Sequence, residues 1–225
     1  MAENKLLILR LEGALQSWGA TSKWDDRDTE DFPTKSGIVG LLGCAMGISR
    51  GDPALAELNA AITIAVRADR RGERITDFQT VTGSPLRNAE GKPKSTGNTL
   101  ISERVYLQDA CFSVFIETEP YWHDRIISAL NAPKWCMYLG RKACVPSRPV
   151  LECADPEYAS LNVALIGYPP ADRPTYPMTY ETEQPDDSLS SITRPDSLIH
   201  ADRGFVRRTV WKGSIKEEDD VSDKN

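Results

Sequence analysis

The segment that most constrains the fold is residues 32–47, where glycines recur inside an apolar run. Pro33 cannot continue a helix from upstream and Thr34 and Ser36 are favourable N-caps, so we expect a helix from about residue 36 to 48. At about 100° per residue, one stripe of this helix holds Gly37, Gly40, Gly43, Cys44 and Gly47. Each interior glycine costs about 1 kcal/mol of helix stability, so either a tightly packed element or a ligand should approach this face.

Lys35 stands at the start of the expected helix, beside backbone N–H groups that have no helical partner. A helix N-terminus and a lysine together favour an anion, so we expect Lys35, Ser36 and Gly37 to contact a phosphate. A plain N-cap is the alternative. The residue order excludes a P-loop, because that motif places Gly-Lys-Ser/Thr after its glycines and here Lys35 and Ser36 precede them.

Charge is unevenly distributed along the chain. Its 225 residues carry a formal net charge of −6, which by itself argues against a nucleic-acid binder. The acids gather at residues 25–31 and 217–223, however, whereas residues 133–149 and 203–216 hold several Lys and Arg residues and no acid. Since local potential decides binding, these basic stretches favour a polyanionic partner.

Composition excludes several other classes. The 5 cysteines include no C-x-x-C and there are only 2 histidines, so we expect no disulfide framework, metal site, cofactor or His-rich catalytic centre. No apolar run approaches the ~20 residues that span a bilayer, and no signal peptide opens the chain. We therefore expect a cytoplasmic protein with no membrane partner.

The order of elements predicts an α+β fold of the ferredoxin-like type, β-α-β-β-α-β. Strands are expected at residues 5–11, 62–68, 75–81, 101–108 and 110–117, with 135–139 as the fourth core strand and helices at 36–48, from Pro53 and from Pro120. A long polar Gly/Pro stretch, residues 82–99, projects between the middle strands. The Pro-rich remainder, with a strand-like piece at 161–166, indicates a small β-rich subdomain at 146–216, followed by a disordered acidic tail at 217–225.

Five segments, in this order, resemble the CasD family of type I-E CRISPR Cascade subunits, within the RAMP superfamily: residues 9–19, 32–43, 77–81, 103–112 and 138–146. The resemblance implies an RRM-like core at residues 1–145 with a long β-hairpin thumb at about 77–108. It implies a non-catalytic part of an antiviral ribonucleoprotein that binds the 5′ handle of crRNA. It also implies contacts with a CasC-type backbone subunit and a CasA-type large subunit, and with target DNA only through the complex.

Several residues outside the helix start are candidate RNA contacts. Trp18, with Gln16 and Ser17 in the loop after the first strand, either stacks on an unpaired base or fills the core. Arg104 and Tyr106 share one face of a strand and suit an RNA backbone with a splayed base.

Two further pairs complete the candidate set. Arg141 and Lys142 follow Gly140 in a turn with no acid nearby, so we expect a phosphate contact there. Thr80 and Val81 are assigned by the resemblance alone, as a wedge at the foot of the thumb. Arg87, Lys92 and Lys94 on the thumb are expected to touch the RNA or the next subunit, with a mobile solvated loop as the alternative. His123 is expected at the surface, on the polar face of its helix, and His200 has no recognisable partner in the sequence.

Two alternative functions stay open. Related type I-C subunits cut precursor crRNA without metal, which needs a general base and a group that stabilises the phosphorane. This sequence shows no Lys-His pair in the corresponding Gly-rich region, so that catalytic set does not transfer. A generic ferredoxin-like binding module is the second alternative, and it predicts scattered basic residues and negligible RNA affinity.

Overall fold

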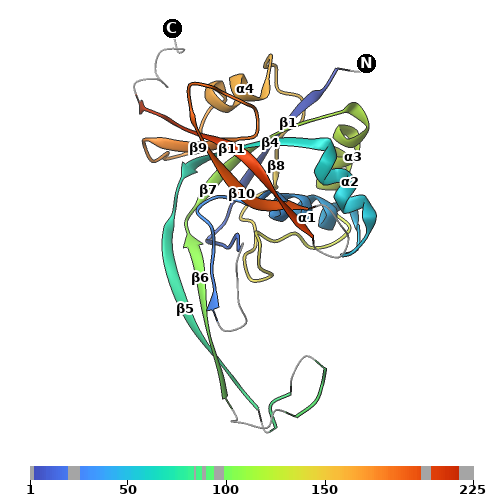
Figure 1. Cartoon of the computed structure of the whole chain (residues 1–225), viewed down its shortest axis with the longest axis vertical. Coiled ribbons are helices and arrows are strands. Elements are labelled where there is room, and N and C mark those ends of the chain that lie inside the picture. The colour runs from blue at the N-terminus through green and yellow to red at the C-terminus, as the bar shows by residue number, and fades with distance from the viewer. Residues whose placement is uncertain are drawn as a thin grey trace.

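The computed structural model describes residues 3–19, 26–83, 85–87, 90–93, 99–198 and 204–217. Its main element is a seven-stranded sheet in which all neighbouring strands are antiparallel (Figure 1). In spatial order the strands are β10 (Ser190–Leu198), β11 (Phe205–Ile215), β9 (Met178–Thr182), β4 (Ile62–Arg70), β7 (Cys111–Thr118), β1 (Lys5–Glu12) and β8 (Leu151–Cys153).

Four of these strands form the expected ferredoxin-like core. β1, β4, β7 and β8 come first to fourth along the chain, and they lie in the sheet in the order four, one, three, two. Side chains alternate along β1, so Leu7 and Leu9 pack on one face of the sheet and Ile8 packs on the other. The helices on the first face are α1 (Lys35–Met46), α2 (Pro53–Ala61) and α3 (Pro120–Asn131).

The C-terminal third continues this sheet, which corrects the expectation of a separate subdomain at residues 146–216. β9 pairs with β4, and β11 and β10 follow outward from β9. α4 (Leu161–Gly167) covers the reverse face, where Leu165 belongs to one cluster with Ile8 and Phe115. Since N-terminal and C-terminal residues share this cluster, the described chain forms one continuous body.

Two expected strands are also corrected. The fourth core strand is β8 rather than residues 135–139, which follow α3 as an irregular segment docked on α1; there the Lys134 N–H donates to the Ala45 carbonyl at 2.9 Å. Residues 161–166 are helical because the Ser160 hydroxyl accepts the Val163 N–H at 3.3 Å and caps α4. Of the expected acidic tail, residues 218–225 lie outside the described residues.

A long hairpin projects from the body (Figure 1). Its strands, β5 (Glu73–Thr82) and β6 (Thr99–Gln108), pair antiparallel along their whole length. The free edge of β6 pairs with two short strands, β2 (Leu15–Gln16) and β3 (Asp26–Arg27). A projecting hairpin was expected at about residues 77–108, and the observed one already begins at Glu73.

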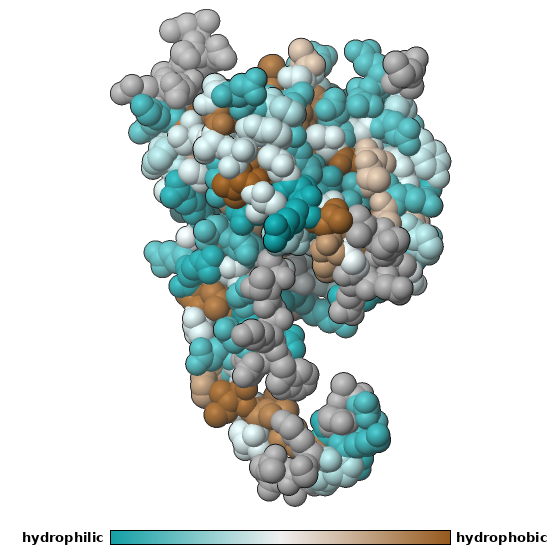
Figure 2. Space-filling view, viewed as in Figure 1, coloured by the Kyte–Doolittle hydropathy of each residue, from teal (hydrophilic) through white to brown (hydrophobic). Residues whose placement is uncertain are grey.

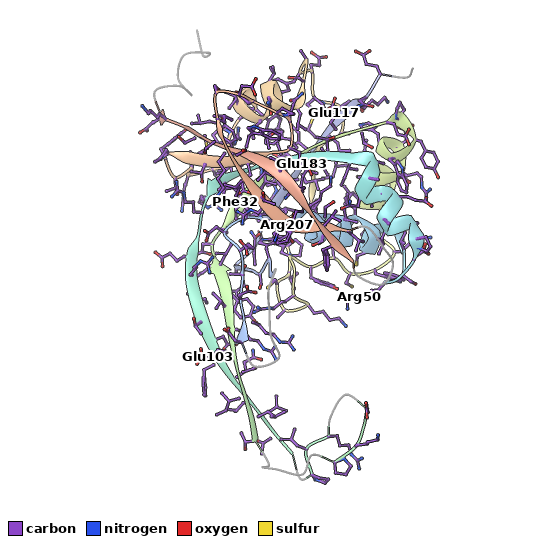
Figure 3. All side chains as sticks on the ribbon, viewed as in Figure 1. Phe32, Arg50, Glu103, Glu117, Glu183 and Arg207 are labelled. Carbon is purple, nitrogen blue, oxygen red and sulfur yellow. The ribbon has the colours of Figure 1, made fainter. Side chains whose placement is uncertain are left out.

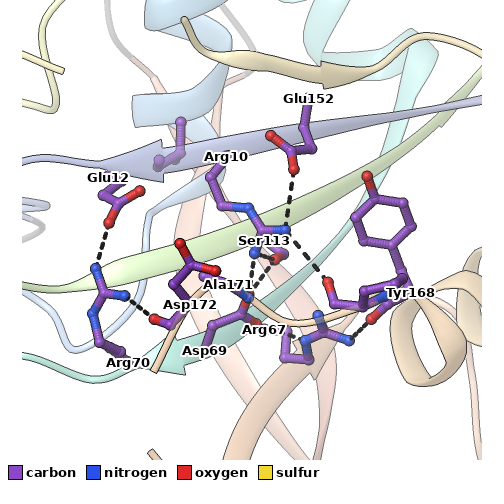
Figure 4. Close-up of polar contacts among 12 residues, drawn as sticks. Arg10, Glu12, Arg67, Asp69, Arg70, Ser113, Glu152, Tyr168, Ala171 and Asp172 are labelled. Carbon is purple, nitrogen blue, oxygen red and sulfur yellow. Dashed lines mark hydrogen bonds and ion pairs between the residues drawn. The ribbon is translucent and has the colours of Figure 1, made fainter. Parts of the chain in front are cut away.

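A buried charge network joins the sheet to α4 (Figure 4). The carboxylate of Asp69 contacts both Arg10 and Arg67, with Arg67 Nε at 2.7 Å, and it accepts the Ser113 hydroxyl at 2.8 Å. Arg67 also donates to the carbonyl of Tyr168, just after α4, at 2.8 Å. Because these charges are buried and paired with one another, we interpret the network as structural, holding α4 on the sheet.

Candidate nucleic-acid interface

Packing accounts for most of the glycine stripe on α1. A Cβ at Gly37 would lie 2.9 Å from the ring of Trp18, and one at Gly43 would collide with the side chain of Leu55. Gly47 ends the helix with a φ of 72°, in the left-handed region that glycine adopts without strain. Close neighbours at Gly37 and Gly43, and the backbone conformation at Gly47, therefore account for these three glycines without a ligand.

Gly40 is the exception on the stripe, because a Cβ there would meet no atom within 4 Å. It faces a groove of about 470 Å³ between α1 and the segments 17–19 and 135–140. The groove lining includes the hydroxyl of Ser36, the cation of Arg50 and the aromatic ring of Trp135, which is 46% exposed (Figure 3 labels Arg50). This face thus combines an open backbone with groups that suit a polar, aromatic ligand.

Lys35 is not a free cation, which corrects its expected phosphate contact. The residue is only 6% exposed, and Nζ lies 3.0 and 3.1 Å from the carboxylate oxygens of Glu183 and 2.9 Å from the Ile62 carbonyl (Figure 3 labels Glu183). The helix start is also occupied, because Asp196 accepts the Lys35 N–H at 2.8 Å. The carboxylates of Glu183 and Asp196 therefore occupy the position where an external phosphate was expected. Ser36 and Gly37 still line the groove.

Trp18 fills the core, so its expected stacking role is wrong and the alternative holds. The ring is 1% exposed and its Nε1 donates to Gln16 Oε1 at 3.1 Å. Gln16 is itself buried and donates to the carbonyls of Leu11 and Ala110 at 3.0 and 2.8 Å. Ser17 is buried too, so these residues shape the groove from behind rather than present free groups to it.

Arg141 clamps the base of the hairpin. Its guanidinium carbon lies 4.7 Å from the ring centre of Tyr106, and its N–H groups donate to the carbonyls of Val105, Arg27 and Asp28 at 3.1, 2.7 and 3.0 Å. The expected phosphate contact of Arg141 is corrected, because internal acceptors occupy the guanidinium. Tyr106 is buried beneath it and is equally unavailable to a splayed base.

Other candidates remain accessible. Lys142, which follows Arg141 in the chain, is exposed. Arg104 lies in register with Asp77 while Tyr106 lies in register with Ile75, so Arg104 and Tyr106 share a face as expected. The groove lining among the described residues includes none of Lys35, Arg104 and Arg141, so the structure does not gather these three cations around it.

Exposed apolar side chains distinguish the hairpin. Val81 is 50% exposed, and two residues that were not singled out, Phe78 and Ile101, are 59% and 52% exposed. Thr80 pairs with Ile101 and Val81 with Leu100, so neighbouring candidates point to opposite faces. Figure 2 shows brown, hydrophobic surface along the hairpin.

The histidines and the basic residues of the hairpin loop complete the set of candidate residues. His123 is buried rather than exposed, with Nε2 2.8 Å from the Ala154 carbonyl. Arg87 and Lys92 are exposed on the hairpin, and Lys94 and His200 lie outside the described residues. Among described residues, no group of three or more His, Cys, Asp and Glu side chains is arranged to hold a metal ion. None of the described helices has the length and apolar character needed to cross a membrane.

Comparison with known proteins places the chain in a family. The sequence model of the family described as CRISPR-associated protein (Cas_Cas5) matches residues 6–211, most of the chain. The chain belongs to the Cas5 family. This Cas5 chain is 34% identical over 178 residues to the CRISPR system Cascade subunit CasD of Escherichia coli (strain K12), covering 72% of this chain and 78% of that relative. The resemblance to CasD is thereby confirmed.

Two solved structures share the fold of this Cas5 chain. A chain from a CRISPR RNA-guided surveillance complex superposes with a TM-score of 0.76 at 30% identity, covering 94% of this chain and 90% of that one. A crystal structure of a Cas protein gives a TM-score of 0.73 at 32% identity, covering 95% and 96%. These matches confirm the expected α+β architecture.

Proposed function

We propose that this Cas5 protein is the CasD-type subunit of a type I-E Cascade complex and that it holds the 5′ handle of crRNA without cutting it. Its similarity to CasD and to a chain of an RNA-guided surveillance complex supports membership of such a complex. The observation that carries the RNA-binding part of the proposal is the groove over Gly40.

The groove offers what an unpaired RNA segment requires. Gly40 lets a ligand approach the α1 backbone, and Ser36 and Arg50 supply a hydroxyl and a cation at its lining. Trp135 is an exposed ring on which a base can stack, worth ~1–3 kcal/mol per base. Single-stranded RNA is recognised by this combination of cation, polar group and aromatic surface. We assign the handle to this groove, with Arg104 and Lys142 as accessible cations for flanking phosphates.

The hairpin is the proposed contact for a neighbouring protein subunit. Phe78, Val81 and Ile101 are exposed on a two-stranded ribbon whose opposite faces both carry apolar groups. A two-stranded hairpin cannot bury these side chains by itself, so burial requires the surface of a partner protein. We propose that the CasC-type backbone subunit provides this cover, that a CasA-type subunit contacts the body, and that target DNA is reached only through the complex.

The described lining of the groove is poorly suited to ribonuclease chemistry. Among its described lining residues there is no His, Asp or Glu to accept the 2′-hydroxyl proton. Cys44 lines the groove, but burial and the nearby Cys136 raise the pKa of its thiol, which makes it a poor source of thiolate. These features favour the holding function over the alternative of a metal-independent endoribonuclease.

The test compares two exposed aromatic residues. In the reconstituted complex, Trp135→Ala should weaken binding of a labelled handle RNA by about tenfold or more, because stacking is lost. Tyr121→Ala is the matched control, since Tyr121 is 57% exposed on α3 and outside the groove lining. Equal effects of the two variants, measured by fluorescence anisotropy, would contradict the groove assignment. Specific cleavage of a labelled repeat RNA without divalent metal would overturn the non-catalytic assignment.

A further inference from the structure

Two cysteines from distant parts of the chain meet beside the groove. Cys44 lies on α1, and Cys136 lies in the irregular segment after α3. The thiol of Cys44 donates to the carbonyl oxygen of Cys136 at 3.3 Å. A backbone hydrogen bond from the Lys134 N–H to the Ala45 carbonyl, 2.9 Å long, holds the same two segments together. The fold therefore brings the backbone of Cys136 into contact with the thiol of Cys44.

The two thiols differ in access, which gives them different roles in thiol exchange. Cys136 is exposed, so it is the thiol that an external reagent meets first, while Cys44 is half-buried behind it. Cys111 and Cys144 are buried. Burial raises the pKa of Cys111 to about 12 and also raises the pKa of Cys144, and it keeps an external reagent away from both thiols.

We propose that Cys44 and Cys136 form a reversible disulfide that clips the segment 132–140 to α1 beside the groove. The thiolate of Cys136 attacks a low-molecular-weight disulfide, RS–SR, and forms a mixed disulfide as one RS⁻ leaves. Cys44, whose raised thiol pKa makes this the slower step, then loses its proton; its thiolate attacks the Cys136 sulfur, and the second RS⁻ leaves. The two cysteine thiols are oxidised, RS–SR is reduced to two RSH, and the cysteine protons end on the released thiols.

The clip acts on the wall of the groove. Trp135 and Tyr138 flank Cys136 in sequence, and both line the groove with Cys44. A bond between the sulfurs would fix this wall relative to α1, whereas the reduced form leaves it held by hydrogen bonds and by the packing of Met137 and Leu139. The pairing itself goes beyond the proposed RNA-binding function and does not depend on it.

Trypsin makes the test direct, because each cysteine falls in a different fragment. Cleavage after Lys and Arg yields residues 36–50, which contain Cys44 alone, and residues 135–141, which contain Cys136 alone. Folded protein is incubated with oxidised glutathione, blocked with an alkylating reagent, digested and analysed by mass spectrometry. We expect the 36–50 and 135–141 fragments to be linked, and the link to disappear on treatment with a thiol reductant.

Variants and a denatured sample make the result decisive. Cys136→Ser, a change at an exposed position, and Cys44→Ser should each abolish the link, whereas Cys153→Ser, at another partly exposed cysteine, should leave it intact. In denaturant, the links should scatter among all five cysteines. The proposal is overturned if folded protein gives the same scatter, if Cys136 pairs mainly with another cysteine, or if the reaction stops at the mixed disulfide.

Discussion

Arg141 shows how a residue that has the chemistry of a phosphate ligand is instead used inside the fold. Its planar guanidinium stacks on Tyr106 and donates to three carbonyl groups. These contacts tie the turn that holds Arg141 to the base of the hairpin. Lysine has a compact ammonium and cannot reproduce both contacts. Arg141→Lys should therefore lower the free energy of unfolding by about 1–3 kcal/mol. Lys142→Ala, at the exposed neighbour, should change it by less than about 0.5 kcal/mol.

Urea denaturation of both variants measures these differences. If Arg141→Lys kept full stability but lost RNA affinity, the result would support the phosphate contact expected from the sequence. It would contradict the structural role assigned to Arg141 at the base of the hairpin.

Lys35 belongs to a buried ion pair, so its loss is predicted to act on stability. Lys35→Met leaves the carboxylate of Glu183 with one cation fewer in a buried site, and the expected loss is on the order of 3 kcal/mol. Lys5→Met removes a surface lysine near Asp124 and Asp155 and should cost less than about 1 kcal/mol. A smaller loss for Lys35→Met than for Lys5→Met would show that the buried pair contributes nothing.

The glycine stripe offers a comparison within one helix. Gly40→Ala meets open space and should stabilise the protein by about 0.5–1 kcal/mol, because alanine is the better helix former. Gly43→Ala meets the side chain of Leu55 and should destabilise the protein or gain less. Thermal unfolding of the two variants measures the sign of each change. The reverse result, with Gly40→Ala destabilising and Gly43→Ala stabilising, would mean that Gly40 rather than Gly43 is the packed position.

At the level of elements, the hairpin should contribute to assembly rather than to the stability of the isolated chain. Phe78→Ser and Ile101→Ser remove exposed apolar groups, so unfolding should hardly change, whereas association with the CasC-type subunit should weaken by more than about 1 kcal/mol for each. Val163→Ser on α4 is the control, since Val163 is also exposed but lies on the body. Native mass spectrometry of the mixtures distinguishes the variants, and equal loss for all three would contradict the assignment.

Sequence patterns predicted individual helices and strands better than they predicted how those elements pack and pair. Pro33 and Thr34 before an apolar run sufficed to place the start of α1, whereas Gly47, expected within the helix, caps its end. The strands expected at residues 5–11, 75–81 and 101–108 match β1, β5 and β6 to within a few residues. The membership of β9 to β11 in the main sheet depends on long-range pairing that no local pattern records. Trp18 and Lys35 were misassigned for the same reason, because their partners, Gly37 and Glu183, are set by tertiary contacts.

For the whole molecule, a net charge of −6 is compatible with an RNA site because acids and bases are segregated, and many acids lie in internal ion pairs. Handle RNA affinity should therefore fall with salt, by about 0.7 log units per log unit of salt for each phosphate neutralised. A salt titration of the assembled complex gives the slope. A slope near zero would favour the generic binding module instead.

The most direct test of the central claim maps where the handle lies. A crRNA with a photoreactive 4-thiouridine at successive handle positions is assembled into the complex, irradiated and digested, and the linked peptides are identified by mass spectrometry. The groove assignment predicts links to residues 36–50 and 135–141, which carry α1 and the Trp135 wall. Links confined to α4 and the reverse face of the sheet, with none to these two peptides, would contradict it.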